Sequence, residues 1–235
     1  MQLFYTPHID GTAIRLEEEE ARHCAQVLRK QVGDTIQVVD GRGGFYEVEL
    51  LEVQKKACLG QITHQQMDFG KRPYYLHLAI APTKNIARLE WFLEKATEIG
   101  IDEISLFTSH HSERRRVRLD RLERIVVSAM KQSVKAYLPK LNELVDFPTF
   151  IQQLQFDGKR YIAHCQAGEK ASLKNNYPPE ANVCILIGPE GDFSLDEIQL
   201  AEANGFEGLS LGTSRLRTET AGVVACHSIN FLNNL

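Results

Sequence analysis

The stretch from Asn182 to Ala221 constrains the fold more than any other part of the chain. Residues 183–187 form a short, β-branched apolar run, which is typical of a strand buried on both faces. The turn 188–191 (Gly-Pro-Glu-Gly) breaks this run, and a second short strand pattern at 208–211 ends at Gly212. Because the carboxyl ends of neighbouring parallel strands line one crevice, we expect both glycine-containing loops to face one small molecule.

The same stretch also predicts two helices. Ser194 and Glu197 form a Ser-x-x-Glu capping box, which starts a helix that ends near Gly205. A polar loop then leads into a final helix from Glu219. Thr218 and Glu219 are open to two compatible interpretations: they cap that helix, or they lie where the helix start offers free N–H groups to a ligand.

The rest of the chain divides into two regions. The N-terminal region is rich in strand patterns, with one helix expected at 17–30, and it predicts a small β-barrel. After Pro73, strand patterns alternate with helical ones, which predicts a parallel α/β sheet. The predicted domains are therefore 1–70 and 74–235, joined by a polar linker. The strand patterns lie at 36–39, 46–51, 57–62, 75–81, 104–107 and 160–165, and the helical ones of the second domain at 86–99, 120–136 and 147–154.

Composition excludes several classes of protein. With 43% apolar and 25% charged residues, the chain is expected to be a soluble globular protein. Its five cysteines are scattered without a C-x-x-C pair, which favours reduced thiols and a cytoplasmic location over disulfides or zinc. No signal sequence, membrane-spanning run, dinucleotide fingerprint or P-loop occurs, and no histidine spacing resembles a metal site. We therefore expect no membrane and no metal.

A cluster of arginines stands out in a chain whose formal net charge is −4. Arg114, Arg115 and Arg116 are consecutive, and Arg118 follows closely. Such a run is either a solvated face or a surface that binds nucleic-acid phosphates, which guanidinium groups match well. The phosphate interpretation is favoured slightly. The barrel would extend the patch through Arg22, Arg29 and Arg42.

Several motifs together resemble one known family. They are ILIGPEGDFSLDEI at 185–198, LGTSRLRTETA at 211–221, His23 with Val27-Leu-Arg29 and Gly33-Asp34, Asp40-Gly41, Lys95 with Glu98 and Gly100, and Gln132 with Pro139. This combination resembles the RsmE family of ribosomal RNA methyltransferases, of the SPOUT class. The resemblance extends over nearly the whole chain.

The resemblance implies a fold, a reaction and partners. The fold would be a PUA-like barrel followed by a SPOUT domain, a parallel sheet with a trefoil knot. The reaction would be methylation of N3 of one uridine in 16S ribosomal RNA, with S-adenosylmethionine as cofactor, by a homodimer acting on the small ribosomal subunit. The cofactor-binding residues would be His164, Ile187, Gly188, Pro189, Glu190, Gly191, Leu211, Gly212, Leu216 and Thr218.

Two residues are catalytic candidates for this reaction. Arg217 would stabilise negative charge on the uracil carbonyl oxygens, and Glu219 would either accept the N3 proton or hold Arg217. Asp192 stands where the family pattern has a glycine, Ser214 also departs from that pattern, and Arg215 is displaced from its usual place by one residue. These departures leave open a ribosome-binding assembly factor whose catalysis is vestigial. A second alternative keeps the fold and is a SPOUT enzyme that methylates a ribose 2′-hydroxyl.

Overall fold

The computed structural model describes residues 2–233, which fall into two compact units. The first contains the residues up to Lys71 together with Val127–Leu138, and the second contains Arg72–Val126 and the residues from Pro139 onward. The outermost residues of the two predicted domains, Met1 and 234–235, lie outside the described part of the chain.

The first unit is built on a six-stranded sheet in the order β1-β4-β5-β6-β3-β2. Strands β4 and β5 form an antiparallel hairpin across the glycine-rich turn at 40–44. The Asp40 carboxylate stabilises this turn, since it accepts hydrogen bonds from the backbone N–H groups of Arg42 (2.7 Å) and Gly44 (2.9 Å). The strands are β1 (Leu3–Tyr5), β2 (Ile9–Asp10), β3 (Ala13–Glu17), β4 (Thr35–Val39), β5 (Phe45–Val53) and β6 (Ala57–Gln66).

Two predicted helices differ from those observed. The helix expected at 17–30 is an α-helix, α1 (Glu18–Arg22), followed by a π-helical segment, η1 (His23–Val27). The helix expected at 120–136 is α3 (Leu119–Gln132), and it ends earlier because Val134 has a φ of 55°, which an α-helix cannot include.

The end of α3 belongs to the first unit because its side chains join the core of that unit. Met130 and Ala136 pack in one buried cluster with Leu3 and Val39. The domain boundaries predicted from the sequence place residues 127–138 in the second domain instead.

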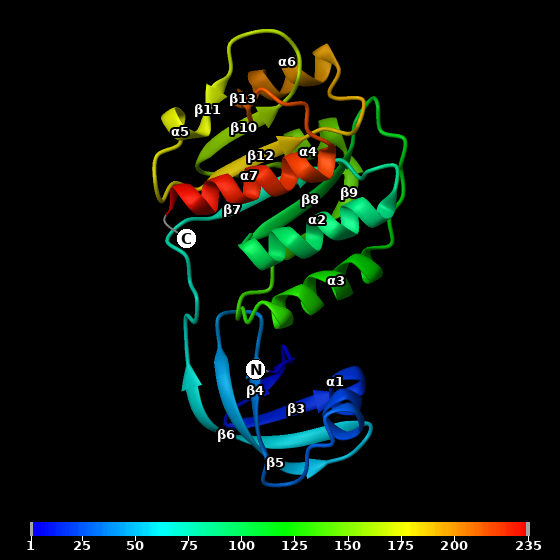
Figure 1. The fold of residues 1–235 in the computed structure, drawn as a ribbon, viewed down its shortest axis with the longest axis vertical. Helices are drawn as coiled ribbons and strands as arrows, with labels where there is room; N and C mark the ends of the chain where they lie inside the picture. The colour runs from blue at the N-terminus through cyan, green and yellow to red at the C-terminus, as the bar shows by residue number, and fades with distance from the viewer. Residues whose placement is uncertain (1, 234–235) are drawn as a thin grey trace. The chain divides into compact units, whose positions relative to one another are not determined.

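The second unit contains a seven-stranded sheet in the order β11-β13-β10-β12-β7-β8-β9, and every pairing in it is parallel (Figure 1). This confirms the predicted parallel α/β architecture. The half-buried edge strand β9 and the short pair β11 and α5 were not predicted. The strands are β7 (Leu76–Ile80), β8 (Glu103–Thr108), β9 (Lys140–Asp146), β10 (Lys159–Ala163), β11 (Ala171–Ser172), β12 (Val183–Ile187) and β13 (Glu207–Ser210).

The helices of the second unit form two groups, each packed on the sheet. Helices α2 and α7 pack against each other, and α7 lies on β7 and β12 (Figure 1). Helices α4 and α6 pack against each other and contact β8, β9 and β13. Successive residues of a strand point to opposite faces, so Ile80 lies near α7 while Ala79 and Ala81 join the cluster that includes α4 and α6. The helices are α2 (Ile86–Ile99), α4 (Phe147–Gln153), α5 (Leu173–Asn176), α6 (Leu195–Ala203) and α7 (Thr218–Leu232).

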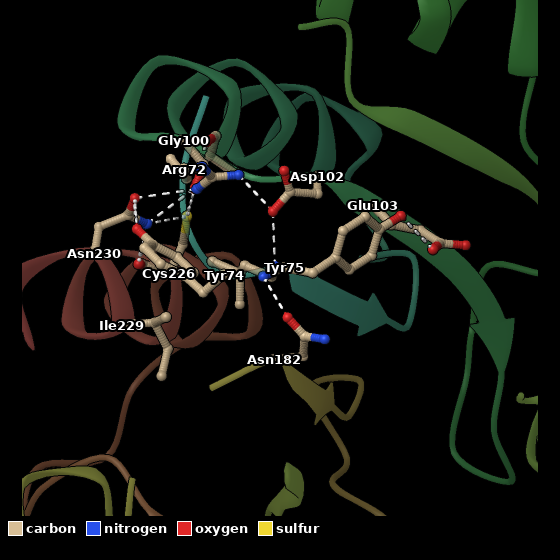
Figure 2. Close-up of polar contacts among 12 residues, drawn as sticks. Arg72, Tyr74, Tyr75, Gly100, Asp102, Glu103, Asn182, Cys226, Ile229 and Asn230 are labelled. Atoms are coloured by element: carbon tan, nitrogen blue, oxygen red, sulfur yellow. Dashed lines mark hydrogen bonds and ion pairs between the residues drawn. The ribbon is translucent and has the colours of Figure 1, made fainter. Parts of the chain in front are cut away.

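A buried polar cluster fixes the C-terminal end of α7 against that of α2 (Figure 2). Asn230 donates hydrogen bonds to the carbonyl of Gly100 (2.9 Å), the C-cap residue of α2, and to the carbonyl of Cys226 (2.7 Å). Its amide oxygen accepts from Tyr74 (2.9 Å) and Arg72 (3.2 Å). A buried amide with all these partners holds the two helix ends in one arrangement.

Within residues 2–233, no helix is both long and apolar enough to cross a membrane. No disulfide joins the five cysteines, all of which lie in this range.

Candidate active site

The carboxyl ends of three neighbouring strands line a cavity of about 920 Å³. Strand β10 lies between β12 and β13, so the loops that follow these strands meet at one edge of the sheet. All of the predicted cofactor-binding residues line the cavity: His164, Ile187, Gly188, Pro189, Glu190, Gly191, Leu211, Gly212, Leu216 and Thr218. The two glycine loops therefore face one cavity, and His164 follows the middle strand of the three.

The loop after β12 is held in shape on both sides. The Glu190 carboxylate accepts a hydrogen bond from the backbone N–H of Lys84 (3.0 Å). Gly191 packs on His111, and a Cβ at Gly191 would lie 2.7 Å from the His111 Cβ, so no larger residue fits without a shift. Asp192 accepts a hydrogen bond from the backbone N–H of Cys165 (2.8 Å), which ties this loop to the one after β10.

His164 is a half-buried histidine at the cavity wall. Burial, and secondarily the nearby Lys170 cation, lowers the pKa of its imidazole below the ordinary value, so the neutral ring is the stable form. Its Nδ1 atom is buried and has no hydrogen-bond partner among residues 2–233. A buried ring nitrogen of this kind is a ready partner for a polar ligand atom.

The loop after β13 leads directly into α7. Gly212 has a φ of 122° and open space where a Cβ would lie, so the bare backbone borders the cavity. Arg217, rather than Thr218, occupies the N-cap position of α7, and its side chain makes no capping hydrogen bond. The interpretation of Thr218 as the N-cap is therefore wrong: Thr218 is the first residue of the helix.

Glu219 is buried at the start of α7, with its side chain only 9% exposed. Its Oε1 atom lies 3.6 Å from Nε of Arg88 on α2, whereas Oε2 has no hydrogen-bond partner among the described residues. No ion pair between Glu219 and Arg217 occurs in the described chain. The alternative in which Glu219 holds Arg217 therefore does not match the structure, where its cationic neighbour is Arg88.

Arg88 was not predicted as a site residue, although it lines both this cavity and a second one of about 540 Å³. The second cavity is also bordered by Trp91, one helical turn further along α2, and by Arg215 and Arg217. Arg88 belongs to none of the motifs used for prediction. The available signal was an arginine three residues before the only tryptophan of the chain, on the exposed face of an amphipathic helix.

The arginines predicted to bind RNA differ in their surroundings. The Arg114 guanidinium donates to the carbonyls of Thr83 (3.0 Å) and Lys84 (2.7 Å), so it holds the turn before α2. Arg115 and Arg116 are exposed. In the first unit Arg22 and Arg29 are exposed, and the exposed Arg42 donates to the carbonyl of Pro7 (3.0 Å).

Comparisons with known proteins agree with this geometry. Residues 70–230 match a model described as an RNA methyltransferase domain, and residues 16–63 match one described as an RNA methyltransferase PUA domain. The chain is 34% identical over 184 residues to ribosomal RNA small subunit methyltransferase E of Mesomycoplasma hyopneumoniae, which covers 76% of this chain and 78% of that protein. The chain belongs to the ribosomal RNA small subunit methyltransferase E family.

Solved structures support the same assignment over the full length. A probable rRNA-methyltransferase from Porphyromonas gingivalis is 42% identical, with a TM-score of 0.91, and the match covers 99% of this chain and 98% of that one. Ribosomal RNA small subunit methyltransferase E from Neisseria gonorrhoeae, solved bound to S-adenosyl methionine, is 26% identical with a TM-score of 0.87 and the same coverage. The RsmE resemblance, the PUA-like N-terminal domain and the SPOUT-type α/β domain are thereby confirmed.

Proposed function

We propose that this chain transfers a methyl group from S-adenosylmethionine to N3 of a uridine in 16S ribosomal RNA. The observation that carries the proposal is the cavity at the ends of β10, β12 and β13, where glycine-rich backbone meets an exposed Arg217, with the buried Glu219 two residues further on. Membership of a family of ribosomal RNA methyltransferases supports this chemistry.

The residues of the cavity fit S-adenosylmethionine. A volume of about 920 Å³ is in the range of small-molecule sites. The unpartnered Nδ1 of His164 and the open backbone at Gly212 offer polar groups to a ligand. We infer that the predicted set His164, Ile187–Gly191, Leu211–Gly212, Leu216 and Thr218 holds the cofactor. When bound, it supplies a methyl group already activated by a sulfonium.

The reaction then requires the chain to manage one proton and one developing charge. Uridine N3 carries a proton and becomes a nucleophile only when that proton is removed. Glu219 has a buried carboxylate oxygen with no partner, which suits a proton acceptor. Arg217 is exposed beside it and can stabilise negative charge on the carbonyl oxygens that flank N3.

The partners follow the family resemblance. We infer a homodimer in the cytoplasm that acts on 16S rRNA within the small ribosomal subunit and needs no metal ion. The PUA-like domain at 1–70 would bind RNA, and the domain at 74–235 would carry a trefoil knot and the reaction. The phosphate-binding residues would be Arg22, Arg29, Arg42, Arg114, Arg115 and Arg116. Among residues 2–233 no group of His, Cys, Asp or Glu side chains is placed to hold a metal ion.

The proposal is tested first by calorimetric titration with S-adenosylmethionine and then by mapping the methylated atom of 16S rRNA by mass spectrometry. We expect Arg217→Ala to lower kcat by about 10²- to 10³-fold while the Kd for S-adenosylmethionine changes little. The same two measurements on Arg215→Ala distinguish the contribution of Arg215 from that of Arg217. Lys174→Ala, which removes an exposed cation on α5, is the control.

The alternatives give different results. Methylation of a ribose hydroxyl would establish the 2′-O-methyltransferase, and absence of cofactor binding would favour an assembly factor. Unchanged methylation in Arg217→Ala would remove the role given to that residue.

A further inference from the structure

The second cavity lies against the first and is lined by residues of α2 and by the segment that leads into α7. Its volume is about 540 Å³, and Arg88, Arg215, Leu216 and Arg217 border both cavities. Asn85 caps α2, because its side chain accepts a hydrogen bond from the Ala87 N–H (3.1 Å). The first turn of α2 is thereby fixed, and the cavity has a defined wall next to the proposed cofactor site.

One residue that lines this cavity, Glu219, has a buried polar atom without a hydrogen-bond partner in the described part of the chain. Its side chain is 91% buried, since only 9% is exposed. Oε1 lies near Nε of Arg88 at 3.6 Å, but the buried Oε2 has no hydrogen-bond partner within residues 2–233. An acceptor of this kind is costly to leave unsatisfied, and a ligand N–H group would satisfy it.

The charges around this acceptor define the ligand. Arg88, Arg215 and Arg217 line the same cavity as Glu219, so three cationic residues are available beside one carboxylate acceptor. The Watson–Crick edge of uracil has the complementary pattern, an N–H between two carbonyl oxygens. Cytosine has an unprotonated N3 at that place, and its lone pair would repel the carboxylate.

Trp91 supplies a surface on which a base can stack. It lines the cavity, is 42% exposed, and lies on the same face of α2 as Arg88, three residues away. Stacking on an exposed aromatic ring is a common way of holding a base that has left its helix.

We infer that this second cavity is the subsite for the target base: a uracil stacks on Trp91, donates its N3–H to Glu219, and depends on Arg88 to orient that carboxylate. The inference rests on the proposed function and adds two residues of α2 to it. Trp91 touches the base, whereas Arg88 is a positioning residue that acts through Glu219. The preference for uridine over cytidine arises from Glu219.

Trp91 is the only tryptophan in the chain, so its fluorescence reports on this subsite alone. The full-length protein is titrated with two short single-stranded RNAs that differ only in a central uridine or cytidine, and the same preparation is titrated with S-adenosylmethionine by calorimetry. We expect the uridine RNA to quench Trp91 and to bind about tenfold more tightly than the cytidine RNA. Glu219→Gln should abolish this preference.

Two further variants separate base contact from structure. Arg88→Met should lose the uridine preference and Arg88→Lys should recover most of it, which a purely structural role would not produce. Trp91→Leu, followed by anisotropy of labelled RNA, should weaken binding about tenfold. Phe231→Leu, which changes an exposed aromatic residue of α7 outside both cavities, should bind like the wild type.

Equal affinity for the two RNAs would overturn the inference, as would an intact preference in Glu219→Gln. Trp91 emission that follows protein concentration instead of RNA would place a second copy of the chain on this surface and would also overturn it. If S-adenosylmethionine binds while the uridine preference is absent, the inference of a base subsite is wrong but the proposed cofactor site stands. If S-adenosylmethionine does not bind, the proposed function fails with it.

Discussion

Asp192 is the residue at which this chain departs from the glycine of the family pattern, and its surroundings allow the consequence to be worked out. Its φ is 63°, a conformation that glycine adopts freely and that aspartate and asparagine tolerate. Its carboxylate accepts hydrogen bonds from the N–H groups of Cys165 (2.8 Å) and of Phe193 (2.9 Å). The side chain thus joins two walls of the proposed cofactor cavity.

The two contributions of Asp192 can be separated by substitution. Asp192→Gly keeps the backbone conformation but removes both hydrogen bonds, which at a half-exposed site costs about 1–2 kcal/mol in total. Asp192→Ala removes the same hydrogen bonds, including the local one to Phe193 that lets aspartate tolerate the left-handed region, so the alanine Cβ is strained there and costs about 1–2 kcal/mol more than glycine. In a domain of this size these losses lower Tm by about 5 °C and about 9 °C, respectively. Asp192→Asn, which keeps one acceptor oxygen, should lie between the wild type and glycine.

Thermal unfolding followed by circular dichroism checks this order, and calorimetry checks its effect on the cavity. We expect Asp192→Gly to weaken S-adenosylmethionine binding about three- to tenfold, because the two loops must then be ordered by the ligand. A glycine variant as stable as the wild type would show that the two hydrogen bonds of the Asp192 carboxylate do not stabilise the fold. An alanine variant as stable as the glycine variant would refute the strain at this position.

Further predictions concern packing, RNA and pH. Gly222→Ala places a Cβ 2.6 Å from the Phe92 ring and should lower the unfolding free energy by about 1–3 kcal/mol in denaturant titrations, unless Phe92→Leu is added to make room. Arg115→Glu should reduce the slope of log K against log salt concentration for RNA binding, measured by filter binding, by about the amount that one phosphate contact contributes. Arg114→Met should mainly destabilise the turn before α2. Burial lowers the pKa of His77 from 6.5 to about 4, so the fold favours the neutral ring, and stability should fall by about 3 kcal/mol as pH decreases from 6.5 to 4. His77→Phe should remove that part of the pH dependence, as measured by urea unfolding at each pH.

The central part of the fold was predictable because its signals are local. The apolar run at 183–187 is strand β12, and the capping box of Ser194 and Glu197 is present with both of its hydrogen bonds. Gly100 ends α2 with a φ of 130°. Each of these depends on a few adjacent residues whose preferences agree with the final structure.

The missed elements depend on distant contacts. Strand β9 is an edge strand with mixed polarity, and its position is set by pairing with β8. Residues 127–138 join the core of the first unit although the chain around them belongs to the second. The neighbours of Glu219 were equally inaccessible, since Arg88 lies 131 positions earlier in the sequence and meets it only through the packing of α2 on α7.

That packing links stability to the proposed chemistry. Helices α2 and α7 run in the same direction and make one contact for each turn. In order along the helices, Arg88 faces Glu219 and the Phe92 ring lies on Gly222. The Ala96 carbonyl then accepts from the Cys226 thiol, and the Gly100 carbonyl accepts from Asn230. The contacts after the first are buried and structural, and only Arg88 and Glu219 border a cavity. Because Gly222 lets the helices approach closely and Asn230 fixes their far ends, the position of the Glu219 carboxylate is set by the whole seam. A substitution at Gly222 should therefore change the uridine preference as well as stability, although it touches neither cavity.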